Sequence, residues 1–94
     1  MRIKVFGKKD CAKCETTKNK FNHFLKKNQC QDDIKFDFYD MDTIDGMAEG
    51  AYDDVFNIPV TIIEKDDKVL ARWDGKVPKT EEFSAHFEEF CAKV

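Results

Sequence analysis

The sequence has little of what a membrane-bound, secreted or disordered chain needs. Its 94 residues include 2 prolines, 4 glycines and 4 cysteines, too few for a low-complexity tract or a dense disulfide framework. No apolar run approaches the ~18 residues of a membrane-spanning helix. A strand-like run begins within two residues of Met1, which leaves no room for a signal sequence. We therefore expect a soluble, cytoplasmic protein without a membrane partner.

Charge of one sign is also scarce. The 16 Lys and Arg residues are nearly balanced by 19 Asp and Glu residues, which gives a net charge of −3. Without a basic stripe to neutralise phosphates, nucleic acid is not an expected partner. Apolar residues make up 41% of the chain and include nine Phe, enough for one core without stapling disulfides. We expect one domain over residues 1–94, and a monomer.

The hydrophobic pattern of the first half predicts strands alternating with helices. Residues 1–7 alternate apolar and charged side chains and stop at a glycine, which predicts a strand. From Cys14 to Leu25 apolar residues recur at helical spacing, and residues 34–41 predict a second strand. A second helix is predicted from about Thr43. Its apolar face would consist of Met47, Ala48, Ala51, Tyr52 and Val55.

The second half predicts a hairpin and a last helix. Polar residues 65–68 separate the apolar runs 60–63 and 69–73, a pattern typical of an antiparallel hairpin. Thr80 is expected to cap a helix with the apolar face Phe83, Phe87, Phe90 and Val94. The order β-α-β-α-β-β-α predicts a mixed four-stranded sheet between helix layers. The first and third helices would cover one face of this three-layer α/β sandwich and the second helix the other.

The chemistry of the chain is concentrated in Cys11-Ala12-Lys13-Cys14. A two-residue spacer at the start of a helix lets the two sulfurs form a disulfide that opens and closes. Unpaired N–H groups and the positive end of the helix dipole favour a thiolate there, so Cys11 is the candidate nucleophile. Cys14 lies one turn deeper, on the core-facing stripe. It is the candidate resolving cysteine, which displaces a mixed disulfide held on Cys11.

Charged side chains next to this pair are expected to tune it. Lys8, Lys9 and Lys13 add positive charge that favours a thiolate at Cys11. Asp10 acts in the opposite direction, because a carboxylate beside Cys11 raises its pKa.

Two other interpretations of the cysteine pair stay open: a structural disulfide, and half of a zinc site. Zinc needs two further ligands, and the available residues, none of which forms a second close pair, are Cys30, Cys91, His23 and His86. The predicted reducing compartment favours redox chemistry with no bound metal or cofactor. Cys30 is expected to be a free surface thiol, Cys91 a packing residue, and His86 a half-buried structural histidine.

The succession of strand, Cys-x-x-Cys, helix and, much later, Ile58-Pro59 ahead of a hairpin resembles the thioredoxin and glutaredoxin superfamily over nearly the whole chain. In that superfamily a cis-proline packs against the cysteine pair, and the backbone beside it holds an extended substrate. The resemblance gives this role to Pro59 with Ile58 and Val60, while the sequence leaves both isomers of the Ile58-Pro59 bond open. It also places Gly75 at the active-site surface. Asp74 and Trp73 would border the same groove, although Trp73 is equally expected to pack in the core.

Several residues depart from the pattern of that superfamily. The spacer is Ala-Lys, where thioredoxins have Gly-Pro and glutaredoxins Pro-Tyr. Asp10 replaces the aromatic residue that thioredoxins have just before the first cysteine. Thioredoxins also use a buried carboxylate for proton transfer, but the first strand has no acidic residue and the nearest positions are Val5 and Phe6. These differences leave the redox potential and the electron donor open. Lys8 is placed to bind a carboxylate of glutathione, but the glycine pair and acidic segment of glutaredoxins are absent.

The sequence predicts a thiol-disulfide oxidoreductase that acts on disulfide-containing proteins. A thioredoxin-reductase-type or glutathione-based donor would recharge the sulfurs. One alternative is a glutathione-dependent, glutaredoxin-like enzyme. The other is a non-catalytic module of the same fold, with structural or zinc-bound cysteines, that binds a partner along the strand edge at Pro59.

Overall fold

A computed structural model describes residues 1–88 of the chain. The elements, in order, are β1 (Arg2–Gly7), α1 (Ala12–Lys27), β2 (Lys35–Asp40), α2 (Ile44–Tyr52), β3 (Val60–Lys65), β4 (Lys68–Asp74), α3 (Thr80–Phe83) and a 3-10 turn η1 (Ser84–Phe87). The predicted order of strands and helices is confirmed. In the described part of the chain, no helix is both long and apolar enough to cross a membrane.

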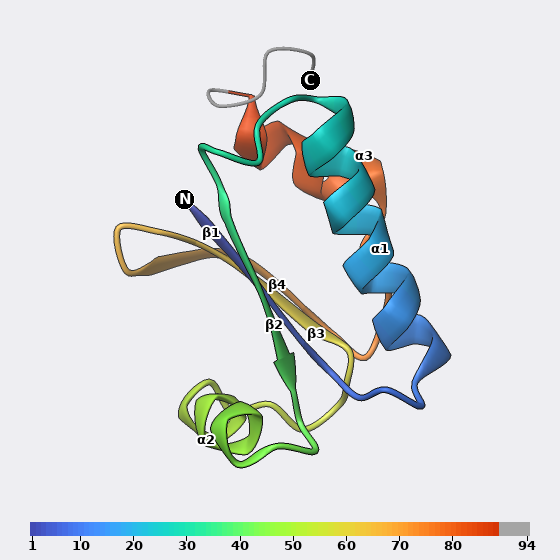
Figure 1. The fold of residues 1–94 in the computed structure, drawn as a ribbon. Coiled ribbons are helices and arrows are strands. Elements are labelled where there is room, and N and C mark those ends of the chain that lie inside the picture. Colours follow the sequence, from blue (N-terminus) through green and yellow to red (C-terminus); the bar gives the residue numbers. More distant parts are fainter. Residues whose placement is uncertain (89–94) are drawn as a thin grey trace.

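The four strands form one mixed sheet in the order β2-β1-β3-β4. β1 runs parallel to β2 and antiparallel to β3, and β3 runs antiparallel to β4. Asp66 and Asp67, both with positive φ, form the two-residue turn between β3 and β4. Figure 1 shows α1 and α3 side by side on one face of the sheet and α2 on the other, so the predicted three-layer sandwich is confirmed.

Each face of the sheet has its own apolar cluster. The larger cluster lies under α1 and includes Ile3, Val5, Phe21, Phe24, Leu25, Ile63, Trp73, Phe83 and Phe87. The ring centroids of Phe21 and Phe83 are 4.5 Å apart, and this contact fixes α3 against α1. The smaller cluster, on the α2 side, consists of Phe6, Val55, Val60 and Ile62. Two residues of the predicted last helix face, Phe90 and Val94, lie outside the described residues.

The predicted apolar face of the second helix is wrong in its orientation. α2 turns Gly46 and Gly50 toward the sheet. Of the five predicted core residues, only Val55 is buried, and it follows the helix; Met47, Ala48, Ala51 and Tyr52 are exposed. The physical reason is a close approach of backbone to backbone. A Cβ at position 46 would lie 1.8 Å from the carbonyl oxygen of Asp40, so only glycine can face the sheet there.

The cap of the last helix lies one residue earlier than predicted. α3 begins at Thr80, and its N-cap is Lys79. The backbone N–H of Lys79 donates to Oε1 of Glu82 at 3.0 Å. This hydrogen bond, followed by a second one from Trp73, holds the pKa of Glu82 below its ordinary value. An acidic side chain in the first turn thus does the capping that was expected of Thr80.

A buried ion cluster ties α2 to the sheet. The side chain of Lys4, on β1, is 5% exposed, and its Nζ lies 2.6 Å from Asp53 and 2.9 Å from Glu64. Burial by itself lowers the pKa of Lys4, but the hydrogen bonds to the two carboxylates outweigh it and the pKa is raised. Because Asp53 is the C-cap of α2, this cluster fixes the end of the helix.

Candidate active site

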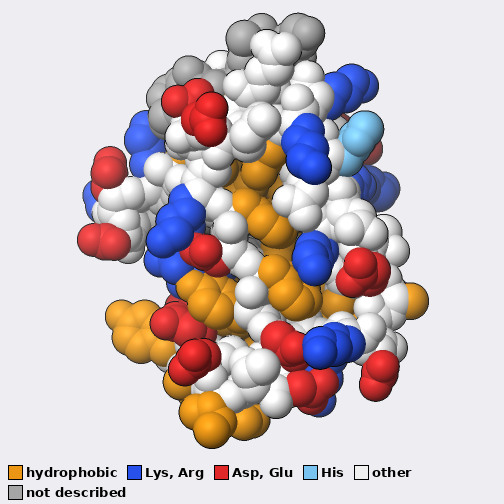
Figure 2. All heavy atoms as spheres, in the orientation of Figure 1, with side chains coloured by type: hydrophobic (Ala, Val, Ile, Leu, Met, Phe, Trp, Pro, Cys, Tyr) orange, Lys and Arg blue, Asp and Glu red, His pale blue; other side chains and the backbone are white. Residues whose placement is uncertain are grey.

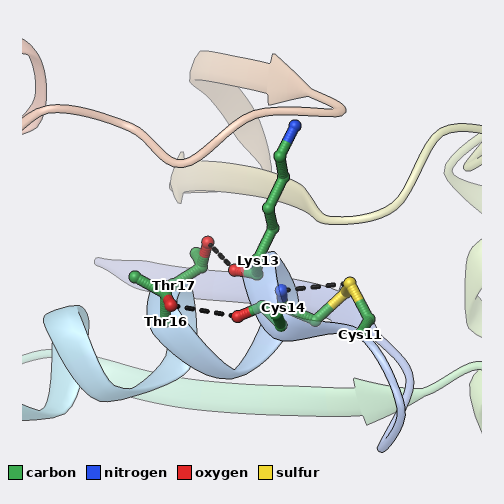
Figure 3. Close-up of a disulfide and its surroundings, with 6 residues drawn as sticks. Cys11, Lys13, Cys14, Thr16 and Thr17 are labelled. Carbon is green, nitrogen blue, oxygen red and sulfur yellow. Dashed lines mark hydrogen bonds between the residues drawn. A yellow bond between two sulfur atoms is a disulfide. The ribbon is translucent and has the colours of Figure 1, made fainter.

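α1 begins directly after Cys11, which is its N-cap residue and has extended backbone angles. The backbone N–H of Cys14 donates to Sγ of Cys11 at 3.1 Å (Figure 3). The sulfur therefore takes the position that a serine or aspartate oxygen occupies in ordinary helix caps. A helix of 16 residues then directs its positive end at this sulfur.

Cys11 and Cys14 form a disulfide, with their Cα atoms 5.1 Å apart. The two sulfurs differ in access to solvent. Cys14 is fully buried, whereas Cys11 is partly exposed. The helical pattern of the sequence thus correctly predicted Cys11 as the more accessible cysteine and Cys14 as the inner one.

Gly7, at the end of β1, makes room for Cys14. A Cβ at position 7 would lie 2.6 Å from the Cβ of Cys14 and 2.8 Å from its Sγ. Any side chain at this position would push the first turn of α1 away from the sheet. The sequence pattern showed Gly7 only as the end of a strand. Its spacing of four residues from the first cysteine was the available signal for this packing role.

Pro59 lies at the same end of the sheet as the disulfide. The Ile58–Pro59 peptide bond is cis. The ladder between β1 and β3 pairs Phe6 with Val60, and continuing it by one residue brings Pro59 opposite Gly7, on which Cys14 packs. Ile58 is partly buried against the cluster on the α2 side.

Gly75 is held against the segment before β3. Its backbone N–H donates to the carbonyl oxygen of Pro59 at 2.8 Å, and its φ of +72° lies in the region that favours glycine. A Cβ on Gly75 would lie 3.4 Å from the Cβ of Asn57. Sequence reasoning did not single out Asn57, which the fold places next to Gly75. The structure therefore brings Gly75, Pro59 and Cys14 together at one end of the sheet.

Trp73 packs in the core, and Asp74 is engaged by a neighbour. Trp73 is 8% exposed, and its indole N–H donates to Oε2 of Glu82 at 3.3 Å. Asp74 is exposed and accepts from Nε of Arg72 at 2.8 Å. The packing interpretation of Trp73 therefore holds. A role of Asp74 in holding substrate stays a prediction.

The charged residues near the cysteines are exposed, and the side chains of two of them are directed away from the Cys11 sulfur. Nζ of Lys8 lies 3.6 Å from Oδ1 of Asp42. Figure 3 shows the side chain of Lys13 extending away from the sulfur of Cys11. Asp10 is exposed. The hydrogen bond at the start of α1 is thus the direct polar contact to the Cys11 sulfur, and tuning of its pKa by these three side chains stays a prediction.

The prediction of a surface thiol at Cys30 is wrong. Cys30 is fully buried in the larger core cluster and is disulfide-bonded. The chain turns inward after α1 because Gln29 adopts a positive φ and the N–H of Cys30 donates to the carbonyl of Leu25 at 3.0 Å.

The other candidate zinc ligands do not form a group in the described chain. Cys91 lies outside the described residues, and His86 is half-buried. Within residues 1–88, no three His, Cys, Asp or Glu side chains are grouped to hold a metal ion.

Thr61 carries a buried hydroxyl group for which residues 1–88 provide no hydrogen-bond partner. The residue is fully buried on β3, between Val5 and Trp73 of the neighbouring strands. An unsatisfied buried hydroxyl costs ~1–3 kcal/mol. We therefore expect Thr61→Val, which keeps the shape and removes the hydroxyl, to raise the free energy of unfolding by about 1 kcal/mol.

The measurement is urea unfolding followed by circular dichroism, with Thr17→Val as the matched control. Thr17 is also fully buried, but its hydroxyl donates to the carbonyl of Lys13 at 2.8 Å, so the same change removes a hydrogen bond there. We expect no stabilisation from Thr17→Val. A loss of stability in Thr61→Val would show that the hydroxyl is satisfied in solution by a bound water molecule.

The family model of the thioredoxin domain matches residues 1–88. The chain belongs to the thioredoxin domain family. Among solved structures, thioredoxin 1 from the thermophilic eubacterium Thermosipho africanus is 22% identical, with a TM-score of 0.74 over 96% of this chain and 93% of that one. A search of curated proteins finds no match.

Two further thioredoxins have the same fold at lower identity. Thioredoxin-2 of the malaria parasite is 19% identical, with a TM-score of 0.76 over 94% of this chain and 81% of that one. Thioredoxin O2 from Arabidopsis thaliana, in its oxidised state, is 14% identical, with a TM-score of 0.74 over 96% and 74%. At such identities these likenesses support the fold, and the chemistry has to be argued from the cysteines.

Proposed function

We propose that this thioredoxin-fold protein is a thiol-disulfide oxidoreductase that reduces disulfides of other proteins in the cytoplasm. The single observation that carries the proposal is the Cys11–Cys14 disulfide at the start of α1, with one accessible and one buried sulfur. A purely structural disulfide has no need of an exposed sulfur at a helix N-terminus, where a thiolate is stabilised.

The reaction begins from the dithiol form. The Cys11 thiolate attacks one sulfur of the substrate disulfide, a new bond forms between them, and the other substrate sulfur leaves as a thiolate that takes up a proton from water. The Cys14 thiol then loses its proton, and its sulfur attacks Sγ of Cys11. The Cys11–Cys14 disulfide forms and the second substrate thiolate leaves. Two electrons have passed from the protein dithiol to the substrate disulfide.

The residues around the pair have separate parts in this proposal. The N–H of Cys14, which donates to Sγ of Cys11, stabilises the attacking thiolate, and the start of α1 adds the favourable dipole. Ile58, Pro59 and Val60, with Asp74 and Gly75, would hold an extended substrate segment beside the sulfurs. Lys8, Asp10 and Lys13 would adjust the pKa of Cys11. An external reductase or glutathione would return the electrons.

The test starts from protein in which the Cys11–Cys14 disulfide alone has been reduced, mixed with insulin or a small aromatic disulfide. We expect one substrate disulfide to be reduced for each protein molecule oxidised, and a protein mass lower by two hydrogens. Sustained turnover with a flavin-dependent thioredoxin reductase or with a glutathione-coupled system then identifies the electron donor. Folded, reduced protein that transfers no electrons to either disulfide would contradict the proposal and favour a non-catalytic binding module.

A further inference from the structure

The outward side of α2 is an apolar stripe without a partner in the described chain. Ile44, Met47, Ala48, Ala51 and Tyr52 follow one another at the spacing i, i+3, i+4, i+7, i+8, which places them on one side of a helix. All five are exposed, Ile44 at 81% and Tyr52 at 84%. Core-facing helices turn such a stripe inward, but here Gly46 and Gly50 occupy the inward side.

The stripe continues into the segment that leads to Pro59. Phe56, which follows α2 and precedes Pro59 by three residues, is 85% exposed. Figure 2 shows hydrophobic side chains gathered over α2, with acidic side chains among them. We call Ile44, Met47, Ala48, Ala51, Tyr52 and Phe56 the α2 outer face. An exposed apolar patch of this kind on a small domain typically marks a contact site.

The segments that flank the α2 outer face reach the end of the sheet that carries the cysteine pair. Just before α2, the N–H of Met41 donates to the carbonyl of Gly7 at 2.8 Å, and Gly7 is the residue on which Cys14 packs. Just before β3, Asn57 lies against Gly75, whose N–H donates to Pro59. A partner seated on α2 can therefore extend to the end of the sheet that carries Cys11.

The segment that carries this face has charge of one sign. Residues 40–57 contain no Lys, Arg or His and six acidic residues, which are Asp40, Asp42, Asp45, Glu49, Asp53 and Asp54. Cations of other elements that reach this region are engaged: Lys4 by Asp53 and Glu64, Lys8 by Asp42, and Arg72 by Asp74 and the carbonyl oxygens of Asp53 and Asp54. Arg2, which lines a cavity with Glu49 and Tyr52, is engaged by Asp37 and Tyr39. Asp45 and Glu49 remain to give the stripe an acidic rim.

We propose that the α2 outer face is the docking surface for a protein partner whose own apolar patch is ringed by Lys and Arg. The inference rests on the proposed function in one respect, that docking presents the partner's disulfide to Cys11. A second copy of this chain would bring acidic rims together, and an anionic lipid surface would be repelled. Complementary charge selects the basic protein, and the apolar stripe supplies the contact area.

The probes are two synthetic amphipathic helical peptides with the same apolar face, one rimmed by Lys and the other by Glu. Each carries a terminal cysteine in a mixed disulfide with a small thiol, and the rate constant of its reduction by the reduced protein is measured. We expect the Lys-rimmed peptide to react about tenfold faster at low salt, because complementary charge acts on the association rate. The advantage is expected to vanish in 1 M salt, where the screening length is about 3 Å.

Two double variants locate the effect on α2. Met47→Ser with Tyr52→Ser removes apolar area, and Asp45→Lys with Glu49→Lys reverses the rim; both are expected to abolish the advantage of the Lys-rimmed peptide. The matched control, Asp32→Lys with Asp33→Lys, makes the same change of charge in the exposed loop after α1 and is expected to keep it. All variants should reduce a small aromatic disulfide at the wild-type rate.

The outcomes separate this inference from the proposed function. Failure to reduce the small disulfide contradicts the proposed function itself. Normal reduction of the small disulfide with equal rates for both peptides, or a faster Glu-rimmed peptide, overturns the docking surface alone. Self-association that sedimentation detects in the wild type and that Met47→Ser with Tyr52→Ser removes would assign the face to a second copy instead.

Discussion

Replacing Cys11 by serine is expected to abolish disulfide reduction, by at least about 10³-fold, the order of loss seen when an enzyme is deprived of its nucleophile. Sγ of Cys11 is the accessible sulfur and the one that accepts the N–H of Cys14, so no other atom of the site can replace it. A serine hydroxyl keeps the helix cap but does not ionise near neutral pH. The measurement is insulin reduction with an excess of electron donor.

Cys14→Ser is the paired variant, and it is expected to fail at a different step. The Cys11 thiolate still attacks, but the mixed disulfide with substrate has no buried sulfur to resolve it and accumulates. Mass spectrometry under non-reducing conditions should find the covalent adduct in Cys14→Ser and not in Cys11→Ser. Equal loss of activity in both variants without any adduct would contradict the assignment of attacking and resolving sulfurs.

The sequence was sufficient for the fold because its signals were local and agreed with one another. Alternation in β1, the stripe from Cys14 to Leu25 and the polar turn between β3 and β4 each specified an element, and the element order limited the topology. The accessible and inner cysteines followed from the same helical spacing. This part of the site could be predicted because the two cysteines are only three positions apart in the sequence.

The parts that sequence reasoning missed depend on contacts between distant segments. Cys14 packs so closely on Gly7 that no side chain fits at position 7, and Asn57 lies against Gly75 only after the hairpin has folded. Cys30 is buried because the chain turns back after α1. The hydrophobic periodicity of α2 was detected correctly, but periodicity gives an apolar side and not what covers it. The close approach at Gly46 decided which side faces the sheet.

That close approach makes Gly46→Ala the substitution with the largest expected effect on stability. The added Cβ would lie 1.8 Å from the carbonyl oxygen of Asp40 and 2.5 Å from its carbonyl carbon, and backbone cannot move away without displacing α2. Overpacking of this kind costs ~1–3 kcal/mol, against a gain of ~1 kcal/mol in helix propensity. Because the clash is with backbone, the cost lies at the upper end of this range, and we expect a net loss of about 2 kcal/mol in the free energy of unfolding, measured in urea.

Gly50→Ala is the matched control, four residues further along the same side of α2. There the added Cβ would meet the far end of the Met41 side chain, at 2.5 Å from Cε and 2.8 Å from Sδ, and a flexible thioether can rotate away. Helix propensity then dominates, and the stability is expected to stay unchanged or to rise by up to about 1 kcal/mol. Equal destabilisation by the two substitutions would mean that helix packing in general, and not the carbonyl of Asp40, fixes the orientation of α2. Because the α2 outer face is exposed only while the glycines face the sheet, Gly46→Ala should also disturb docking, whereas Gly50→Ala should leave it intact.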